Sequence, residues 1–171
     1  MLPSPDRAAA SSGGPGVVNF SVNVSAVSRL PLTPERAWRL LTDWERQPAW
    51  MRDAESVRVL TDRRAGVGVH VAVRTRVLGV PLFTECLEVV AWEPPRRLVI
   101  AHRSFIHGVG VWRLDPVPGG SLFRWVEEIT LPIPMLGTLA LWIYRPVMRR
   151  LMRGSMRRLR KLAPRYGSEE T

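Results

Sequence analysis

The middle of the chain, residues 55–131, carries strand and turn patterns throughout, and no other feature constrains the fold as strongly. In its clearest part, residues 67–77, valine or threonine stands at every second position, with glycine, histidine, alanine or arginine between. This period of two is typical of a strand with one buried and one wet face. Strands are predicted at about 55–61, 67–78, 80–92, 97–105, 109–115 and 122–131. Since the separators are short and rich in glycine and proline, consecutive strands should form hairpins in an antiparallel meander.

One further strand and two short helices are predicted before this region. From Val17 to Ser25, valine and phenylalanine alternate with asparagine and serine, which indicates a half-buried strand. Thr33 suits a helix N-cap and the proline after it suits the first helical position, so a short helix should begin there and end near Asp43. Residues 43–50 should form a second short helix or an ordered loop, because Pro48 limits helix length.

The last segment, Met135–Leu162, has the spacing of a long amphipathic helix. Met148, Leu151 and Leu159 fall in one arc, and most of the arginines fall in the opposite arc. Pro146 lies inside the segment and should kink or restart the helix. The curved antiparallel sheet, of about seven strands, has one apolar face and the helix has one apolar stripe. Burying both together predicts an α+β fold in which the helix packs on the sheet.

Length and composition fit one globular domain with short ends. The chain has 171 residues, of which 46% are apolar and 23% charged, and this excludes wholesale disorder. We expect a disordered lead-in at 1–16, a folded domain at 17–163 and a flexible tail at 164–171. The lead-in lacks the apolar run of a signal peptide or anchor, and the single cysteine, Cys86, has no partner for an internal disulfide. A cytoplasmic protein is therefore expected, with a peripheral membrane location as the alternative.

Four local motifs, in this order and spacing, resemble the polyketide cyclase/dehydrase-type group of the SRPBCC superfamily, which has the START-like helix-grip fold. They are Thr33-Pro34-Glu35-Arg36-Ala37-Trp38; Asp43 through Pro48 with Trp50 and Met51; Trp92-Glu93-Pro94-Pro95-Arg96-Arg97-Leu98; and Trp112-Arg113-Leu114-Asp115-Pro116 with Gly119-Gly120-Ser121. With the terminal helix, the resemblance covers about residues 17–163.

The resemblance implies a sheet wrapped around the C-terminal helix, with a cavity between them for an apolar small molecule or a lipid. Such proteins include lipid carriers, hormone receptors, quinone-binding chaperones and aromatase/cyclases, so the fold alone does not choose a function. No nucleotide-binding or other cofactor fingerprint is present, and no cofactor is expected.

The seven tryptophans suit the walls of such a cavity, although they would equally fill a solid core. Trp50 and Met51 follow the short helices, where family cavities have their mouth, and Trp112 and Trp125 lie on neighbouring predicted strands. The candidate ligand-binding residues are Trp50, Met51, Val71, Val73, Trp112, Trp125, Trp142 and Met148.

Candidate catalytic groups are few. The phase that turns Phe123 and Trp125 inward also turns Glu127 inward, where a carboxylate among aromatic rings could do acid–base chemistry. It could equally pair with a strand arginine such as Arg74 or Arg113. His70 and His102 are weaker candidates, because a histidine that is exposed or satisfied by neighbours is the commoner case. Ligand spacing typical of zinc is absent from the sequence, so no metal is expected.

The terminal helix is strongly basic. From Arg145 to Arg165 there are eight arginines and one lysine and no acidic residue. These charges could form a solvated face, or they could contact an anionic membrane, where each contributes about 1 kcal/mol. Arg145, Arg149, Arg153 and Arg157 are the candidate membrane contacts. Nucleic acid is not an expected partner, because no recognised binding motif accompanies the charge.

Three functions follow. The first is the binding or transport of a small hydrophobic ligand such as a lipid, a polyketide-like compound or an aromatic metabolite. The second is an aromatase/cyclase- or dehydratase-type enzyme acting on a poly-keto intermediate. The third is a peripheral lipid carrier that docks on membranes through the basic helix.

Overall fold

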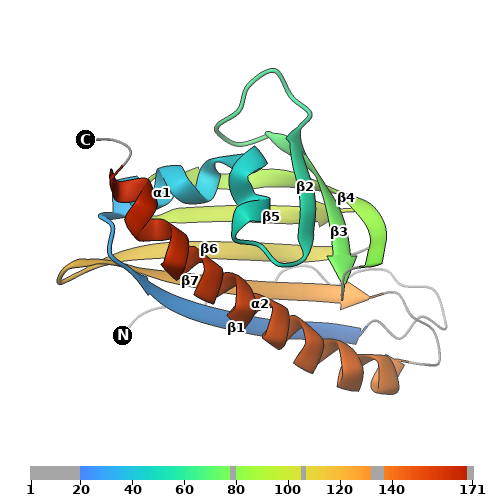
Figure 1. The fold of residues 1–171 in the computed structure, drawn as a ribbon. Coiled ribbons are helices and arrows are strands. Elements are labelled where there is room, and N and C mark those ends of the chain that lie inside the picture. Colours follow the sequence, from blue (N-terminus) through green and yellow to red (C-terminus); the bar gives the residue numbers. More distant parts are fainter. Residues whose placement is uncertain (1–19, 78–79, 105–106, 132–136, 169–171) are drawn as a thin grey trace, which may run out of the picture.

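Seven antiparallel strands form one curved sheet in the order β1-β7-β6-β5-β4-β3-β2, with a long helix lying across it (Figure 1). The computed structural model describes residues 20–77, 80–104, 107–131 and 137–168. The strands are β1 (Phe20–Leu30), β2 (Ala54–Val59), β3 (His70–Val77), β4 (Val80–Glu93), β5 (Arg97–Arg103), β6 (His107–Val117) and β7 (Gly120–Leu131). The helices are α1 (Pro34–Thr42), the 3-10 helix η1 (Trp44–Ala49) and α2 (Gly137–Ser168). The α+β fold predicted from the sequence is confirmed.

The two short helices carry the chain from one edge of the sheet to the other. β1 forms one edge, α1 and η1 cross to β2 at the opposite edge, and the meander then returns strand by strand to β7. β7 closes the sheet by pairing with β1 without a register shift, from Phe20 opposite Leu131 to Leu30 opposite Ser121. Both N-terminal helices occur as expected, with the Thr33 side chain accepting a hydrogen bond from the Arg36 N–H.

Strand ends differ from the expected ones where glycine intervenes. β3 begins at His70 rather than at residue 67, because Gly66 and Gly68 have positive φ angles of 99° and 82° that interrupt the extended backbone. β6 ends at Val117 rather than at residue 115, and β7 begins at Gly120 rather than at residue 122. At Gly120, a Cβ atom would lie 2.0 Å from the carbonyl oxygen of Leu30, so the close approach to β1 requires glycine.

The interior is centred on a group of aromatic rings. Trp50, Trp112, Trp125 and Phe123 pack edge to face with ring centroids 5.8–6.5 Å apart, an arrangement that aromatic pairs prefer. A second group, Trp38, Trp44 and Trp92, joins α1 and η1 to β4. α2 contributes an apolar stripe to the core, made of Met152, Met156, Leu159 and Ala163.

α2 differs from its expected course. It is helical from Gly137 through Pro146 and Pro164 to Ser168, so the restart expected at Pro146 does not occur and the helix passes the expected end at Leu162. A proline removes one backbone hydrogen bond, and the packing of the apolar stripe on the sheet holds the turns that follow Pro146. None of the helices in the described part of the chain combines the length and the apolar run needed to cross a bilayer.

We predict that Leu159→Ala lowers the free energy of unfolding by about 2–5 kcal/mol, because it leaves a cavity under α2 where Leu159 is fully buried. Urea unfolding followed by circular dichroism measures the change. Arg158→Ala is the control, since Arg158 is the exposed neighbour on the same turn, and its effect should stay within about 0.5 kcal/mol. Equal losses in the two variants would contradict the assigned packing of α2.

Candidate functional site

A histidine lies between two carboxylates on the inner face of the sheet. His102 of β5 contacts Glu85 of β4 through Nδ1 at 2.7 Å and Glu127 of β7 through Nε2 at 3.1 Å. The three side chains are only 8–10% exposed. Each ring nitrogen has a carboxyl group as its partner, so the arrangement suits a ring that donates an N–H on both sides, which is an imidazolium. We call Glu85, His102 and Glu127 the interior cluster.

Gly110 makes this contact across the sheet possible. β6 lies between β5 and β7, and on β6 the residue directly opposite Glu127 is Gly110. A Cβ atom at Gly110 would lie 2.7 Å from Oε1 of Glu127. With no side chain there, the carboxylate lies over β6 and reaches the His102 ring. Its other oxygen, Oε1, accepts a hydrogen bond from the indole N–H of Trp125, which joins the cluster to the aromatic group.

The carboxylates determine the charge state of His102. Burial is the largest single influence and lowers its pKa, but hydrogen bonds and charges from Glu127 and Glu85 together outweigh burial and raise the pKa to about 10. At neutral pH the raised pKa therefore favours the imidazolium form of His102.

Asp53, just before β2, adds a third interior carboxyl group. Burial is the largest influence on its pKa, and together with the charges of Glu127 and Glu85 it raises the pKa to about 6 against the opposing effect of a backbone hydrogen bond. Its Oδ1 atom is buried without a hydrogen-bond partner among the described residues, as is the indole nitrogen of Trp50. The interior thus holds an unsatisfied acceptor and an unsatisfied donor, which is uncommon in a native core.

The structure brings together two of the three sequence-predicted catalytic candidates. Glu127 points inward as predicted and meets His102, whereas His70 on β3 stands opposite Glu88 of β4 and makes no described contact with the cluster. The alternative in which Glu127 pairs with a strand arginine is wrong, since its partner is His102 and Arg74 instead pairs with Glu55 at 3.2 Å.

Sequence reasoning missed Glu85 and Asp53. Glu85 shares the phase of Val89 on β4, so the period of two would have placed it inward had that strand been read residue by residue. Asp53 lies outside any strand, and no periodic signal marks it. In the described part of the chain, no three histidine, cysteine or acidic side chains are arranged to hold a metal ion.

The predicted ligand-binding residues have different surroundings. Trp50, Trp112 and Trp125 are buried in the aromatic group, Val71 is fully buried beside them in the core, and Met51, Val73 and Met148 are partly buried against it. The side chain of Trp142 lies outside the described residues. Whether these residues line a ligand cavity stays a prediction.

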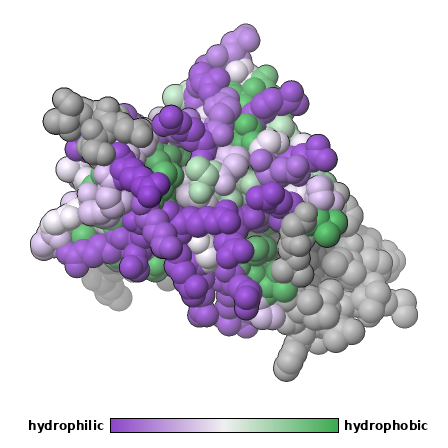
Figure 2. Space-filling model, viewed as in Figure 1, coloured by the Kyte–Doolittle hydropathy of each residue, from purple (hydrophilic) through white to green (hydrophobic). Residues whose placement is uncertain are grey.

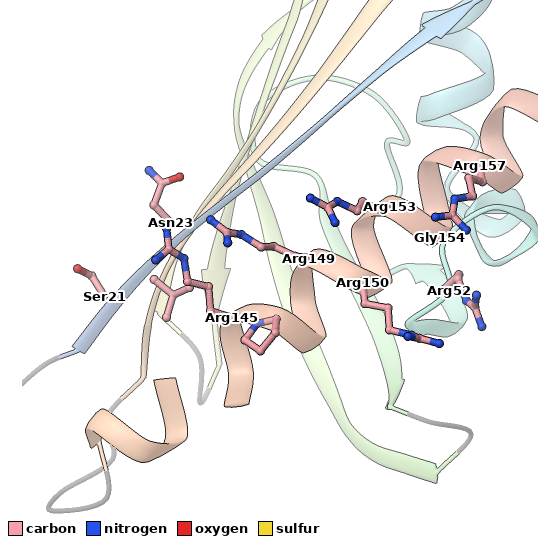
Figure 3. A pocket seen from close by; sticks show the side chains of 11 residues that line it. Ser21, Asn23, Arg52, Arg145, Arg149, Arg150, Arg153, Gly154 and Arg157 are labelled. Atoms are coloured by element: carbon pink, nitrogen blue, oxygen red, sulfur yellow. The ribbon is translucent and has the colours of Figure 1, made fainter. Parts of the chain in front are cut away.

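A second, very different site lies on the outside, between β1 and α2. A cleft of about 1240 Å³ opens there, and Figure 3 shows Arg149 and Arg153 extending from α2 towards β1. Its cationic side chains are Arg52, Arg145, Arg149, Arg150, Arg153 and Arg157, which include all four candidate membrane contacts. We call it the arginine cleft. Hydrophilic residues also run across this face of the molecule where Figure 1 places α2 (Figure 2).

The raised pKa of His102 predicts a pH-dependent stability. The folded pKa, about 10, exceeds the ordinary value of 6.5, so the stabilisation is complete below about pH 6.5 and is lost as the pH rises through 10. We expect the free energy of unfolding to fall over this window by a few kcal/mol, at about 1.4 kcal/mol per pKa unit. Urea unfolding at several pH values should show the fall in the wild type and not in His102→Gln. The control His107→Gln changes an exposed histidine and should keep it, and parallel curves for wild type and His102→Gln would contradict the prediction.

Comparisons with known proteins agree with this architecture. The structure resembles one domain of the di-domain aromatase/cyclase StfQ from the steffimycin biosynthetic pathway, with a TM-score of 0.69, 15% identity, and coverage of 86% of this chain and 52% of that one. It also resembles a START superfamily protein from Mycobacterium smegmatis, with a TM-score of 0.65, 12% identity and coverage of 82% and 98%. A protein from Thermus thermophilus, TTHA0849, gives a TM-score of 0.60 at 22% identity, with coverage of 82% and 97%.

In sequence, no curated protein matches the chain. Residues 21–164, however, match the family described as polyketide cyclase / dehydrase and lipid transport. That match spans the sheet, the short helices and nearly all of α2. The chain therefore belongs to the polyketide cyclase/dehydrase and lipid transport family of the SRPBCC superfamily.

Proposed function

We propose that the protein binds or transports one small, mostly apolar molecule between the sheet and α2, with Asp53 and the indole N–H of Trp50 as its polar contacts. The observation that carries the proposal is a group of ionisable side chains placed against aromatic rings in the core. Burying an unpaired polar atom costs about 1–3 kcal/mol. A solid core gains nothing from Asp53 Oδ1 and the Trp50 N–H lacking partners.

A ligand that carries both an acceptor and a donor, as a hydroxyl group or an N–H amide does, accounts for both atoms. Its acceptor would take the Trp50 N–H, and its donor would reach the Asp53 carboxylate. Trp112 and Trp125 offer rigid apolar walls to the remainder, as binding sites for flat apolar molecules usually do. Membership of a family that includes lipid transport proteins supports the same role. We place the activity in the cytoplasm, as the sequence suggests.

Binding of an uncharged fluorophore tests this proposal. N-phenyl-1-naphthylamine is neutral, so it does not respond to the arginine cleft. We expect saturable one-to-one binding, with the affinity reduced roughly tenfold in Trp112→Leu, since one aromatic contact contributes about 1 kcal/mol or more. Trp38→Leu is the matched control, because Trp38 belongs to the other aromatic group, and its affinity should match the wild type. Absence of saturable binding, together with no small molecule carried through purification in native mass spectrometry, would refute the proposal.

A cyclase-type enzyme is the second candidate, and Asp53 is the observation that favours it. Near neutral pH, a carboxylate of pKa about 6 suits a general base. It would take the acidic proton between two carbonyl groups of a poly-keto chain. The carbanion would then attack a further carbonyl carbon to form the ring bond, and protonated Asp53 would return its proton to the new alkoxide. Asp53 would next take the remaining α-proton while the hydroxyl group leaves, so that water is lost and a carbon–carbon double bond forms.

The enzymatic candidate predicts that Asp53→Asn abolishes cyclisation of a short poly-keto thioester while fluorophore binding persists. The wild-type rate should rise with pH through about 6, because the base acts only when deprotonated. Asp62→Asn, an exposed aspartate in the turn after β2, is the control. Product formation is followed by mass spectrometry. Turnover that survives Asp53→Asn would exclude this carboxylate as the base.

A further inference from the structure

The arginine cleft gathers cations from two separate parts of the chain. Five of its arginines lie on α2, and the sixth, Arg52, comes from the loop between η1 and β2. None of the six takes part in an ion pair within the part of the chain that the structure describes. Arg145, Arg149, Arg153 and Arg157 follow one another at intervals of four, a spacing at which like charges destabilise a helix. The fold therefore holds these guanidinium groups together against their repulsion.

Gly154 gives Arg52 its place in the cleft. A Cβ atom at Gly154 would lie 2.3 Å from Cδ of Arg52, so the arginine stem occupies the space that a side chain on α2 would fill. Figure 3 shows Arg52 beside Gly154, with Arg157 one turn along the helix. The N–H of Arg52 donates to Oγ of Ser155 at 3.0 Å and anchors this loop to α2. Two local features thus seat a sixth cation against an already cationic helix.

A smaller hollow continues the cleft along β1. It has a volume of about 310 Å³ and shares Arg153 and Arg157 with the cleft. Ser28, which also lines it, is only 5% exposed, and its Oγ atom has no hydrogen-bond partner among the described residues. A buried hydroxyl without a partner, next to unpaired guanidinium groups, offers one more donor to an anion.

From this arrangement we propose that the arginine cleft binds a phosphate group. Guanidinium groups match phosphate oxygens with paired N–H donors, and several of them together suit the charge of a phosphate monoester. The cationic row along α2 is about 18 Å long at 1.5 Å per residue, which leaves room for the organic part of the molecule. The phosphate belongs either to a lipid headgroup at a membrane surface or to a soluble phosphate ester, and the same chemistry recognises both.

Two probes separate these sources. Inorganic phosphate, measured by isothermal titration calorimetry, reports recognition of a free phosphate. Co-sedimentation with phosphatidylcholine vesicles, with and without phosphatidic acid, reports recognition of a headgroup. Binding in the first assay alone assigns the cleft to soluble phosphate esters, and binding only to vesicles with phosphatidic acid assigns it to a membrane surface. Binding in neither assay overturns the proposal.

Matched arginine variants distinguish a site from diffuse charge. Arg52→Gln and Arg153→Gln should each weaken binding about tenfold, the effect of losing one hydrogen bond to a charged group. Arg158→Gln removes the same charge from the same helix but lies outside both hollows, and its binding should stay within about twofold of the wild type.

Gly154→Ala should weaken binding as Arg52→Gln does, because it displaces the arginine stem, while thermal melting shows the helix intact. Equal losses in Arg158→Gln and Arg153→Gln would overturn the proposal. Neither result depends on the fluorophore assay of the interior.

Discussion

The packing of α2 on the curved sheet is the interaction on which the rest of the structure depends. No other long helix is described, so its stripe of Met152, Met156, Leu159 and Ala163 covers the open side of the meander. The stripe is narrow and contains two methionines, which adapt to irregular neighbours. On its other side the helix lines the arginine cleft. One element therefore separates an aromatic, acid-containing interior from a cationic exterior, and both sites exist only while it stays in place.

The ionisable side chains of the interior cluster can be buried because they lie side by side across the strands of the sheet. A carboxylate from β4, an imidazolium from β5 and a carboxylate from β7 alternate in sign, and each neighbour lowers the cost of burying the next. The alternation depends on a strand that contributes no side chain at Gly110. Asp53 has no such cation beside it, and its carboxyl group is accordingly the one whose pKa burial raises towards neutrality. Both His102 and Asp53 have raised pKa values, and perturbed pKa values that cluster in this way are a common mark of functional sites.

The sequence predicted the parts of this molecule that repeat along the chain. The seven-stranded meander, the capped first helix and the inward phase of Glu127 all follow from periods of two and 3.6 or from local capping. The contacts of the site do not repeat. His102 meets Glu127 only because a strand between them has glycine at the right register, and Arg52 meets α2 only because Gly154 leaves space. Such pairings join residues far apart in the chain, so local patterns and secondary-structure propensities cannot predict them. The long α2 was predicted from its spacing, and only the restart offered at Pro146 does not occur.

Arg52 and Asp53 are adjacent in the chain yet belong to different sites. The first lines the cleft, and the second carries the isolated carboxyl group of the interior. Their backbone is held on both sides, by Ser155 of α2 and by the N–H of Arg76, which donates to the Asp53 carbonyl. A displacement of this dipeptide would therefore move a side chain of the arginine cleft and a side chain of the interior together. Linked equilibria are reciprocal, so any factor by which an interior guest changes the affinity for an anion is the factor by which the anion changes the affinity for the guest. That factor departs from one only to the extent that filling one site moves this dipeptide.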